Sequence, residues 1–129
     1  MWTFEQVTGF LFYDGTKVAA GYSGHGAGVD NPTMENVADV GPLPCGFYTI
    51  GPAYTDPEKG PLVMRLAPDA ANQMFGRGGF LIHGDSISHP GCASEGCIIM
   101  GPAVRQQIAQ SPDRRLQVVL RFEAATVAV

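Results

Sequence analysis

Short apolar stretches, broken by glycine, proline and polar residues, recur along this 129-residue chain. Strict alternation of apolar and polar positions is typical of a half-buried strand, and residues 115–122 alternate most clearly. Asp14-Gly15 lies between two apolar runs, and this dipeptide favours the two-residue turn of a hairpin. The other predicted strands are residues 2–7, 9–13, 16–22, 46–50, 62–66 and 80–82. The side chains predicted to form core stripes are Phe10, Phe12, Leu116, Val118, Leu120 and Phe122.

Residues 102–110 form the one segment with the pattern of a full helix. Pro102 suits its first position, because the N–H that proline lacks has no partner there. A shorter helical turn is expected within residues 68–77. Many short strands with one helix predict a mainly β fold, either a sandwich or a partly closed barrel. The length predicts a single domain over residues 1–129.

Charge and hydropathy exclude some classes of partner. The net charge is −4 and no cluster of lysine and arginine occurs, which argues against nucleic acid. No apolar run approaches the roughly 20 residues that cross a membrane, so no membrane insertion is expected. The first residues lack the basic segment and apolar run of a secretory signal, so we expect any export to use another route or a leader that this sequence does not include.

The strongest chemical candidates lie within residues 80–100. His83 ends one apolar run, and Cys97 follows Gly96 at the start of another. A cysteine nucleophile needs a base, and a distant histidine supplies one when adjacent strands carry the two residues. We therefore predict acyl transfer with Cys97 as nucleophile and His83 as base. Backbone N–H groups near Gly96 and Cys97 are the expected oxyanion donors, and either Asp85 or a carbonyl such as that of Gly84 is expected to orient the histidine.

These residues resemble the signature of the L,D-transpeptidases of the YkuD type. That signature is a His-Gly pair, a loop, and then Ser/Thr-His-Gly-Cys followed by apolar residues. The matching stretches are His83-Gly84, Ser94–Met100, the strand Pro44–Ile50, and an opening hairpin Leu11–Gly15 that ends in Tyr22-Ser23-Gly24. The resemblance covers roughly residues 9 to 122. It implies an L,D-transpeptidase-like fold.

Two departures narrow the resemblance. Glu95 stands where the family usually has a second histidine, and only ten residues separate His83 from Ser94. In both features the chain resembles compact L,D-transpeptidase-like toxins that are delivered by type VI secretion. The resemblance implies a protein secreted without a signal peptide into the periplasm of target bacteria. It further implies L,D-carboxypeptidase activity or D-amino-acid exchange on tetrapeptide stems of peptidoglycan, with a cognate immunity protein as partner.

The resemblance also implies roles for individual residues. The Gly84 carbonyl is the usual third member beside Cys97 and His83. Ser94 is expected to support the loop or contact substrate. A negative charge near a thiol raises its pKa, so Glu95 is expected to point away. The residues expected to bind substrate or the oxyanion are Ser94, Gly96, Asp85 and His89.

Two other functions compete with catalysis by a thiol. One is a zinc site with mixed nitrogen, oxygen and sulfur donors from His83, Asp85, His89, Cys92 and Cys97. Their spacing fits no common zinc pattern, so we predict no metal and no cofactor. The other is a non-catalytic module that binds the cell wall. The cysteines also allow two arrangements: a Cys45–Cys92 disulfide with Cys97 free, or three reduced thiols.

Overall fold

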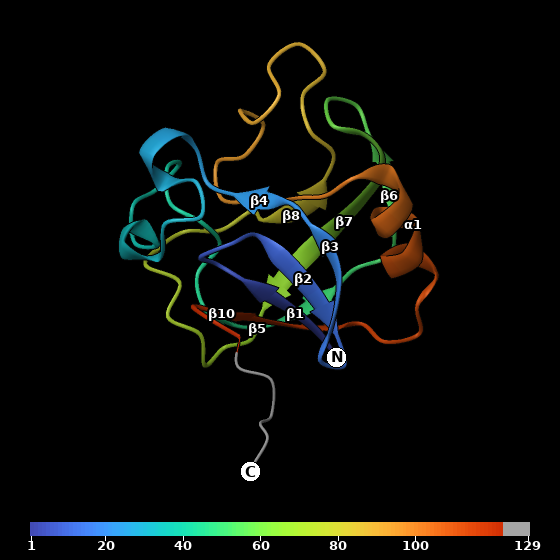
Figure 1. Ribbon diagram of the computed structural model, residues 1–129, viewed down its shortest axis with the longest axis horizontal. Coiled ribbons are helices and arrows are strands. Elements are labelled where there is room, and N and C mark those ends of the chain that lie inside the picture. The colour runs from blue at the N-terminus through green and yellow to red at the C-terminus, as the bar shows by residue number, and fades with distance from the viewer. Residues whose placement is uncertain (123–129) are drawn as a thin grey trace.

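The computed structural model describes residues 1–122 (Figure 1). One helix, α1, covers Pro102–Gln110, and 3₁₀ turns cover Gly26–Gly28 and Pro32–Met34. The strands are β1 (Trp2–Glu5), β2 (Phe10–Tyr13), β3 (Thr16–Ala20), β4 (Tyr22–Ser23), β5 (Gly46–Ile50), β6 (Tyr54–Asp56), β7 (Gly60–Pro68), β8 (Leu81–His83), β9 (Ile98–Ile99) and β10 (Arg115–Val119). They form one sheet in the order β3-β2-β1-β10-β5-β7-β8-β9-β4, and β6 pairs with β7 beside this path. The β1–β10 and β8–β9 pairs are parallel.

The sheet curls into a nearly closed barrel. Strands β3 and β4 lie at opposite ends of the sheet order, yet only Gly21 separates them in the chain. The Gly21 N–H donates to the Gly9 carbonyl at 2.8 Å. A Cβ atom on Gly21 would overlap the Ile99 carbonyl, and one on Gly9 would overlap the Gly21 carbonyl. Glycine at both positions therefore lets the two edges of the sheet approach each other closely.

Apolar side chains from most strands fill the barrel. In β10, Leu116 and Val118 are buried, and they lie beside Trp2 and Phe4 of the parallel neighbour β1. Helix α1 covers one side of the barrel (Figure 1) and adds Ile108 to the same core. The other core members are Leu11, Leu43, Tyr48, Ile50, Met64, Leu66, Phe80, Ile82, Ile98, Met100 and Val104.

Several local predictions are confirmed. The fold is mainly β with a nearly closed, barrel-like sheet and one helix, as the patterning indicated. Helix α1 has the predicted bounds, 102–110. Asp14 and Gly15 join β2 to β3 with φ angles of 47° and 86°, the left-handed values that a tight hairpin turn requires. No helix among the described residues is long and apolar enough to span a bilayer.

The helical turn expected within residues 68–77 is absent. The Asn72 side chain instead pairs with the backbone of Phe47, because its Oδ1 accepts from the N–H at 3.0 Å and its Nδ2 donates to the carbonyl at 2.9 Å. An amide side chain thus satisfies groups that a neighbouring strand would otherwise bind. Phe75 and Gly76 follow with φ angles of 58° and 71°, which a helix does not accommodate.

The core stripe predicted over residues 115–122 is too long. The ladder between β1 and β10 ends at Glu5 and Val119, so Leu120 lies beyond it and is 49% exposed. Phe122 is half-buried and stacks on Phe12 with ring centroids 4.5 Å apart. These two rings therefore pack outside the central core.

Candidate active site

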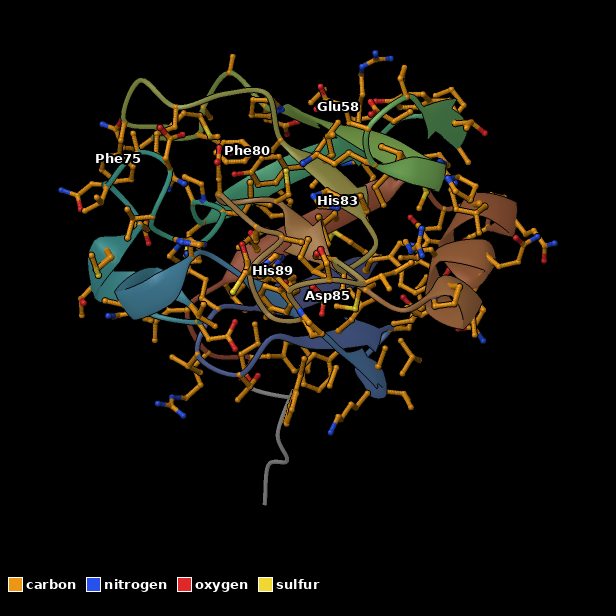
Figure 2. All side chains as sticks on the ribbon, turned by 90° about the horizontal axis from the view of Figure 1, so that it is seen from above. Glu58, Phe75, Phe80, His83, Asp85 and His89 are labelled. Carbon is orange, nitrogen blue, oxygen red and sulfur yellow. The ribbon has the colours of Figure 1, made fainter. Side chains whose placement is uncertain are left out.

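A groove of about 1630 Å³ opens at one end of the barrel. The β8–β9 loop, the β6–β7 turn and the start of α1 all contribute to its lining. In Figure 1 this loop and this turn project from the upper end of the barrel. Figure 2 looks down on that end and places His83 near the centre, with Phe80 and Glu58 around it.

Adjacent strands bring His83 and Cys97 to this groove. In the parallel pair, Ile82 lies beside Ile98 and His83 beside Ile99. Cys97 directly precedes β9, and the Leu81 N–H donates to its Sγ at 3.3 Å. Because alternate residues of a strand share a face, the imidazole and the thiol lie on the same side of the sheet, and both line the groove.

His83 is held as a neutral imidazole with one free lone pair. Its Nδ1 lies 2.8 Å from the Gly84 carbonyl oxygen, which only accepts, so Nδ1 carries the proton. Nε2 is therefore the basic nitrogen, and among residues 1–122 it is the one buried side-chain nitrogen or oxygen without a hydrogen-bond partner. Burial lowers the pKa of His83, which the Gly84 hydrogen bond opposes and the charges of Lys59 and Arg105 reinforce. The ring is accordingly uncharged near neutral pH.

The resting Cys97 thiol is protonated. Burial raises its pKa most strongly, and the negative charge of Glu95 adds to this effect. The Leu81 N–H and the charge of Lys59 act in the opposite direction. No hydrogen bond joins Cys97 Sγ to His83 Nε2 in this conformation. Catalytic hydrogen bonds are often long without substrate, so the pair is compatible with a base and a nucleophile that meet when substrate binds.

Ser94 organises the turn before Cys97 from beneath the groove. Its hydroxyl is buried, donates to the Cys97 carbonyl at 2.6 Å, and accepts from the N–H groups of Gly24 at 2.9 Å and Gly96 at 3.0 Å. Ser94 does not line the groove. The Gly96 N–H is therefore occupied, whereas the Cys97 N–H donates to no described group and is available to an oxyanion.

Gly96 and Arg77 fix the same turn from the other side. Gly96 has a φ angle of 125°, and a Cβ atom there would overlap the side chains of Arg77 and Phe80. Both terminal nitrogens of Arg77 donate to backbone carbonyls, one of them that of Glu95 at 3.3 Å and the others in residues 35–42. The Glu95 side chain itself is exposed at the groove, and its charge still acts on Cys97 despite the expectation that it points away.

Asp85 holds the β8–β9 loop rather than the histidine ring. It accepts from Tyr22 Oη at 2.6 Å, from the Ser86 N–H at 2.8 Å and from the Gly91 N–H at 3.1 Å. Burial raises the pKa of Asp85, but these hydrogen bonds outweigh burial and lower it overall. Burial and the bond to Asp85 raise the pKa of Tyr22 to about 12. His89, on the same loop (Figure 2), is exposed, lies 3.1 Å from Ser88 Oγ and does not line the groove.

Two basic residues at the groove were not singled out from the sequence. The segment 56–61 was interpreted as a surface turn, yet Lys59 lines the groove and its charge acts on both His83 and Cys97. Arg105 looks like the polar side of an ordinary surface helix, but it is only 8% exposed. Only the long-range packing of β7 and α1 places them there, so no local pattern could have identified them.

The structure gives no support to a zinc site in residues 1–122, because no three His, Cys, Asp or Glu side chains there are grouped to hold an ion. Asp85 is occupied by Tyr22 and by the backbone of its own loop. All three thiols, which lie in this part of the chain, are free, so the Cys45–Cys92 disulfide is not formed.

The fold and the groove define a small β-barrel protein with a cysteine and a histidine at one end. Comparison with protein-family models matches residues 17–121 to the Tlde1 domain. The chain therefore belongs to the Tlde1 domain family, whose members are type VI secretion effectors of the L,D-transpeptidase kind. Comparisons with curated proteins and with solved structures found no significant match. Membership confirms the prediction of an effector that is delivered into target cells and acts on peptidoglycan.

Proposed function

We propose that this protein is a cysteine-dependent enzyme that cleaves the terminal D-amino acid from tetrapeptide stems of peptidoglycan, or exchanges it. Cys97 is the nucleophile, His83 the base and the Gly84 carbonyl the group that orients the base. The chain forms a single catalytic domain. The observation that carries the proposal is the buried, unpartnered Nε2 of His83, a residue that lines the same groove as Cys97, while Nδ1 is committed to Gly84.

In the first half-reaction, His83 Nε2 takes the proton from Cys97 Sγ after a shift that brings the two atoms into contact. The thiolate attacks the carbonyl carbon of the diaminopimelate residue at the third position of the stem. The Cys97 N–H donates to the oxyanion that forms. The imidazolium of His83 then protonates the amine of D-alanine as the C–N bond breaks, which leaves a thioester on Cys97.

In the second half-reaction, an acceptor releases the acyl group. His83 removes a proton from water or from the amine of a D-amino acid, and that acceptor attacks the thioester carbonyl. Water gives a tripeptide stem, and an amine gives an exchanged stem, while Cys97 recovers its proton from His83. The open groove admits either acceptor.

The location of this substrate has consequences for delivery. Stem peptides are accessible in the periplasm, so we propose that type VI secretion places the protein there. A producing cell exposes the same substrate, so a cognate immunity protein is expected to protect it. Co-expression with this protein in the periplasm tests a candidate immunity protein. A candidate that does not reduce the toxicity of this protein is excluded as the partner.

The proposal is tested by incubating tetrapeptide muropeptides with the wild-type protein and with Cys97→Ala, and analysing products by mass spectrometry. We expect release of D-alanine by the wild type and at least a 1,000-fold slower release by Cys97→Ala. Cys92→Ala is the matched control, because Cys92 also lines the groove but is exposed on the loop. Full activity of Cys97→Ala, or no product with the wild type, would overturn the proposal.

A further inference from the structure

Arg105 is a buried cation beside the groove. It lies in the first half of α1, is 8% exposed and lines the groove. Its Nε donates to the Met100 carbonyl at 2.9 Å, and its Nη1 donates to the carbonyls of Pro61 at 2.8 Å and Leu62 at 3.4 Å. Its remaining terminal nitrogen, Nη2, has no hydrogen-bond partner in the described chain.

No acidic side chain compensates the charge of Arg105 within residues 1–122. Burial is the one influence on its pKa and lowers it, but a guanidinium still carries its proton at neutral pH. A buried charge is costly unless it is paired, and backbone carbonyls supply dipoles rather than a counter-charge. The site therefore retains a positive charge that an anion can neutralise.

Two other arginines, Arg114 and Arg77, use both terminal nitrogens to bind backbone carbonyls and so have a structural role. Arg114 donates from Nη1 to the carbonyls of Ile108 and Ser111, and from Nη2 to the carbonyl of Gly51 at 2.6 Å. Arg77 likewise uses both terminal nitrogens on carbonyls. Arg105 differs because one terminal nitrogen stays free, and this residue, unlike Arg114, lines the groove.

The free nitrogen lies beside Gly84, the residue that follows His83. A Cβ atom built on Gly84 would come within 2.7 Å of Arg105 Nη2, so the absence of a side chain at Gly84 leaves this nitrogen accessible. Lys59 also lines the groove, and its charge acts on His83. Glycine, lysine and arginine together make this end of the groove suited to an anion that lies beside the reacting centre.

The acidic residues Asp39 and Glu95 line the groove at a different place from Arg105. They extend from the groove, which Glu58 and Asp85 also line, into a second, smaller hollow of about 190 Å³ together with Arg77 and Phe80. Arg105, Lys59 and His83 do not line that hollow. A peptide that spans the groove is therefore expected to place its carboxylate toward Arg105 and its neutral or cationic part toward Glu95.

We propose that Arg105 Nη2 binds a carboxylate of the stem peptide and so positions the scissile carbonyl beside Cys97. This inference rests on the proposed function. A tetrapeptide stem carries two carboxylates close to the scissile bond, the C-terminal carboxylate of D-alanine and the side-chain carboxylate of diaminopimelate. Arginine suits either, because its planar fork donates to carboxylate oxygens with a full charge.

The test separates binding from chemistry. In the Cys97→Ala background, calorimetry measures the affinity for a tetrapeptide with both carboxylates free, for its C-terminal amide and for its diaminopimelate amide. We expect one amide to bind at least about tenfold more weakly, which identifies the carboxylate that Arg105 binds. Added Arg105→Lys should weaken binding of the free acid about tenfold and leave binding of that amide unchanged.

Arg114→Lys is the matched control, because it alters a guanidinium that binds backbone carbonyls outside the groove and should change none of the three affinities. Where Arg105→Lys does not fold, Gly84→Ala replaces it, since the added methyl group obstructs Nη2 and should weaken binding of the free acid alone. Equal affinity for all three peptides, or an equal loss for all three in Arg105→Lys, would refute the inference. Loss of the acid-to-amide difference in Lys59→Gln would assign the carboxylate to Lys59 and also refute it.

Activity assays distinguish the enzymatic function of the protein from the role of Arg105. If the wild-type protein releases no D-alanine from any stem, the proposed function is wrong. If it releases D-alanine while kcat/KM for acid and amide substrates falls by the same factor in Arg105→Lys, the function holds and Arg105 has a structural role only.

Discussion

Two regions of the barrel bury polar groups, one around strands β1 and β10 and the other around β8 and β9. The two regions differ in whether these buried groups have hydrogen-bond partners. At the end of β1, Glu5 accepts from Thr8 Oγ1 and from the Phe122 N–H. The neighbouring Gln6 is fully buried and donates to the Leu43 carbonyl at 2.9 Å. At the end of β8, His83 is equally buried, yet its Nε2 has no partner.

This difference separates residues that stabilise the barrel from residues that are available for chemistry. Burial without a hydrogen bond costs free energy, so proteins rarely leave such a group without a reason. Here the cost falls on a basic nitrogen at a groove that also contains a thiol. The strands that carry it are short, three residues in β8 and two in β9, and side-chain hydrogen bonds rather than a long ladder hold the turn before Cys97.

The largest effect is expected when the unpartnered group is removed. His83→Gln should lower kcat/KM for D-alanine release by about 10²- to 10⁴-fold, the usual contribution of a general base. The melting temperature should stay within a few degrees of the wild type, because no hydrogen bond of Nε2 is lost. Steady-state kinetics and thermal denaturation measure the two quantities.

Phe4→Ala is the control from the other region. Phe4 is fully buried beside Val118, so its truncation should cost about 3–5 kcal/mol of unfolding free energy while folded molecules retain their kcat. Equal losses of stability in the two variants would mean that His83 is a core residue, and the distinction between the regions would fail.

A smaller effect on both properties is expected at Ser94. Ser94→Ala removes a buried hydroxyl that makes two hydrogen bonds at the turn before Cys97 and a third with the Gly24 N–H. We expect a loss of about 1–3 kcal/mol of unfolding free energy, because the backbone N–H groups of Gly24 and Gly96 lose their acceptor. Activity should also fall, through kcat more than through KM, because Ser94 lies outside the groove and positions Cys97 without contacting substrate.

Ser86→Ala tests whether any serine of this region has the same effect. Ser86 is half-buried and its hydroxyl accepts from the His89 N–H in its own loop, so both stability and kcat should stay near wild type. A rise in KM without a change in kcat for Ser94→Ala would instead place Ser94 in contact with substrate.

Local patterns were sufficient to predict the elements that depend on neighbouring residues. The hairpin at Asp14-Gly15 follows from turn chemistry, and the helix 102–110 follows from its initial proline. The hydrogen bond from His83 to the Gly84 carbonyl joins adjacent residues, so a motif could indicate it. Assignment to the Tlde1 family agrees with the resemblance found in the residues around Cys97.

Features that depend on distant packing could not be predicted in this way. Nothing around Lys59 indicates that the β6–β7 turn lies over a histidine 24 positions later. The buried state of Arg105 depends on the carbonyls of Pro61 and Leu62, and Leu62 has a φ angle of 58°. The helical turn expected within 68–77 was lost to a side-chain pairing with Phe47, which is equally remote in sequence.

The smallest effects concern the charge around Cys97, where two substitutions should act in opposite directions. Glu95→Gln removes a negative charge that disfavours the thiolate, so the pKa of Cys97 should fall. Lys59→Gln removes a positive charge that favours the thiolate, so the pKa should rise. Both side chains are exposed, and solvent screening keeps each shift small.

The rate of alkylation by iodoacetamide as a function of pH reports this pKa, because only the thiolate reacts. Peptide mass spectrometry separates Cys97 from Cys45 and Cys92. The alkaline midpoint should lie above that of an exposed thiol in the wild type, since burial raises the pKa of Cys97, and should move down in Glu95→Gln and up in Lys59→Gln. Glu58→Gln, a loss of charge from the same groove, should move the midpoint less than either. Shifts of the same sign in Glu95→Gln and Lys59→Gln would mean that a change in the burial of Cys97, and not charge, governs its reactivity.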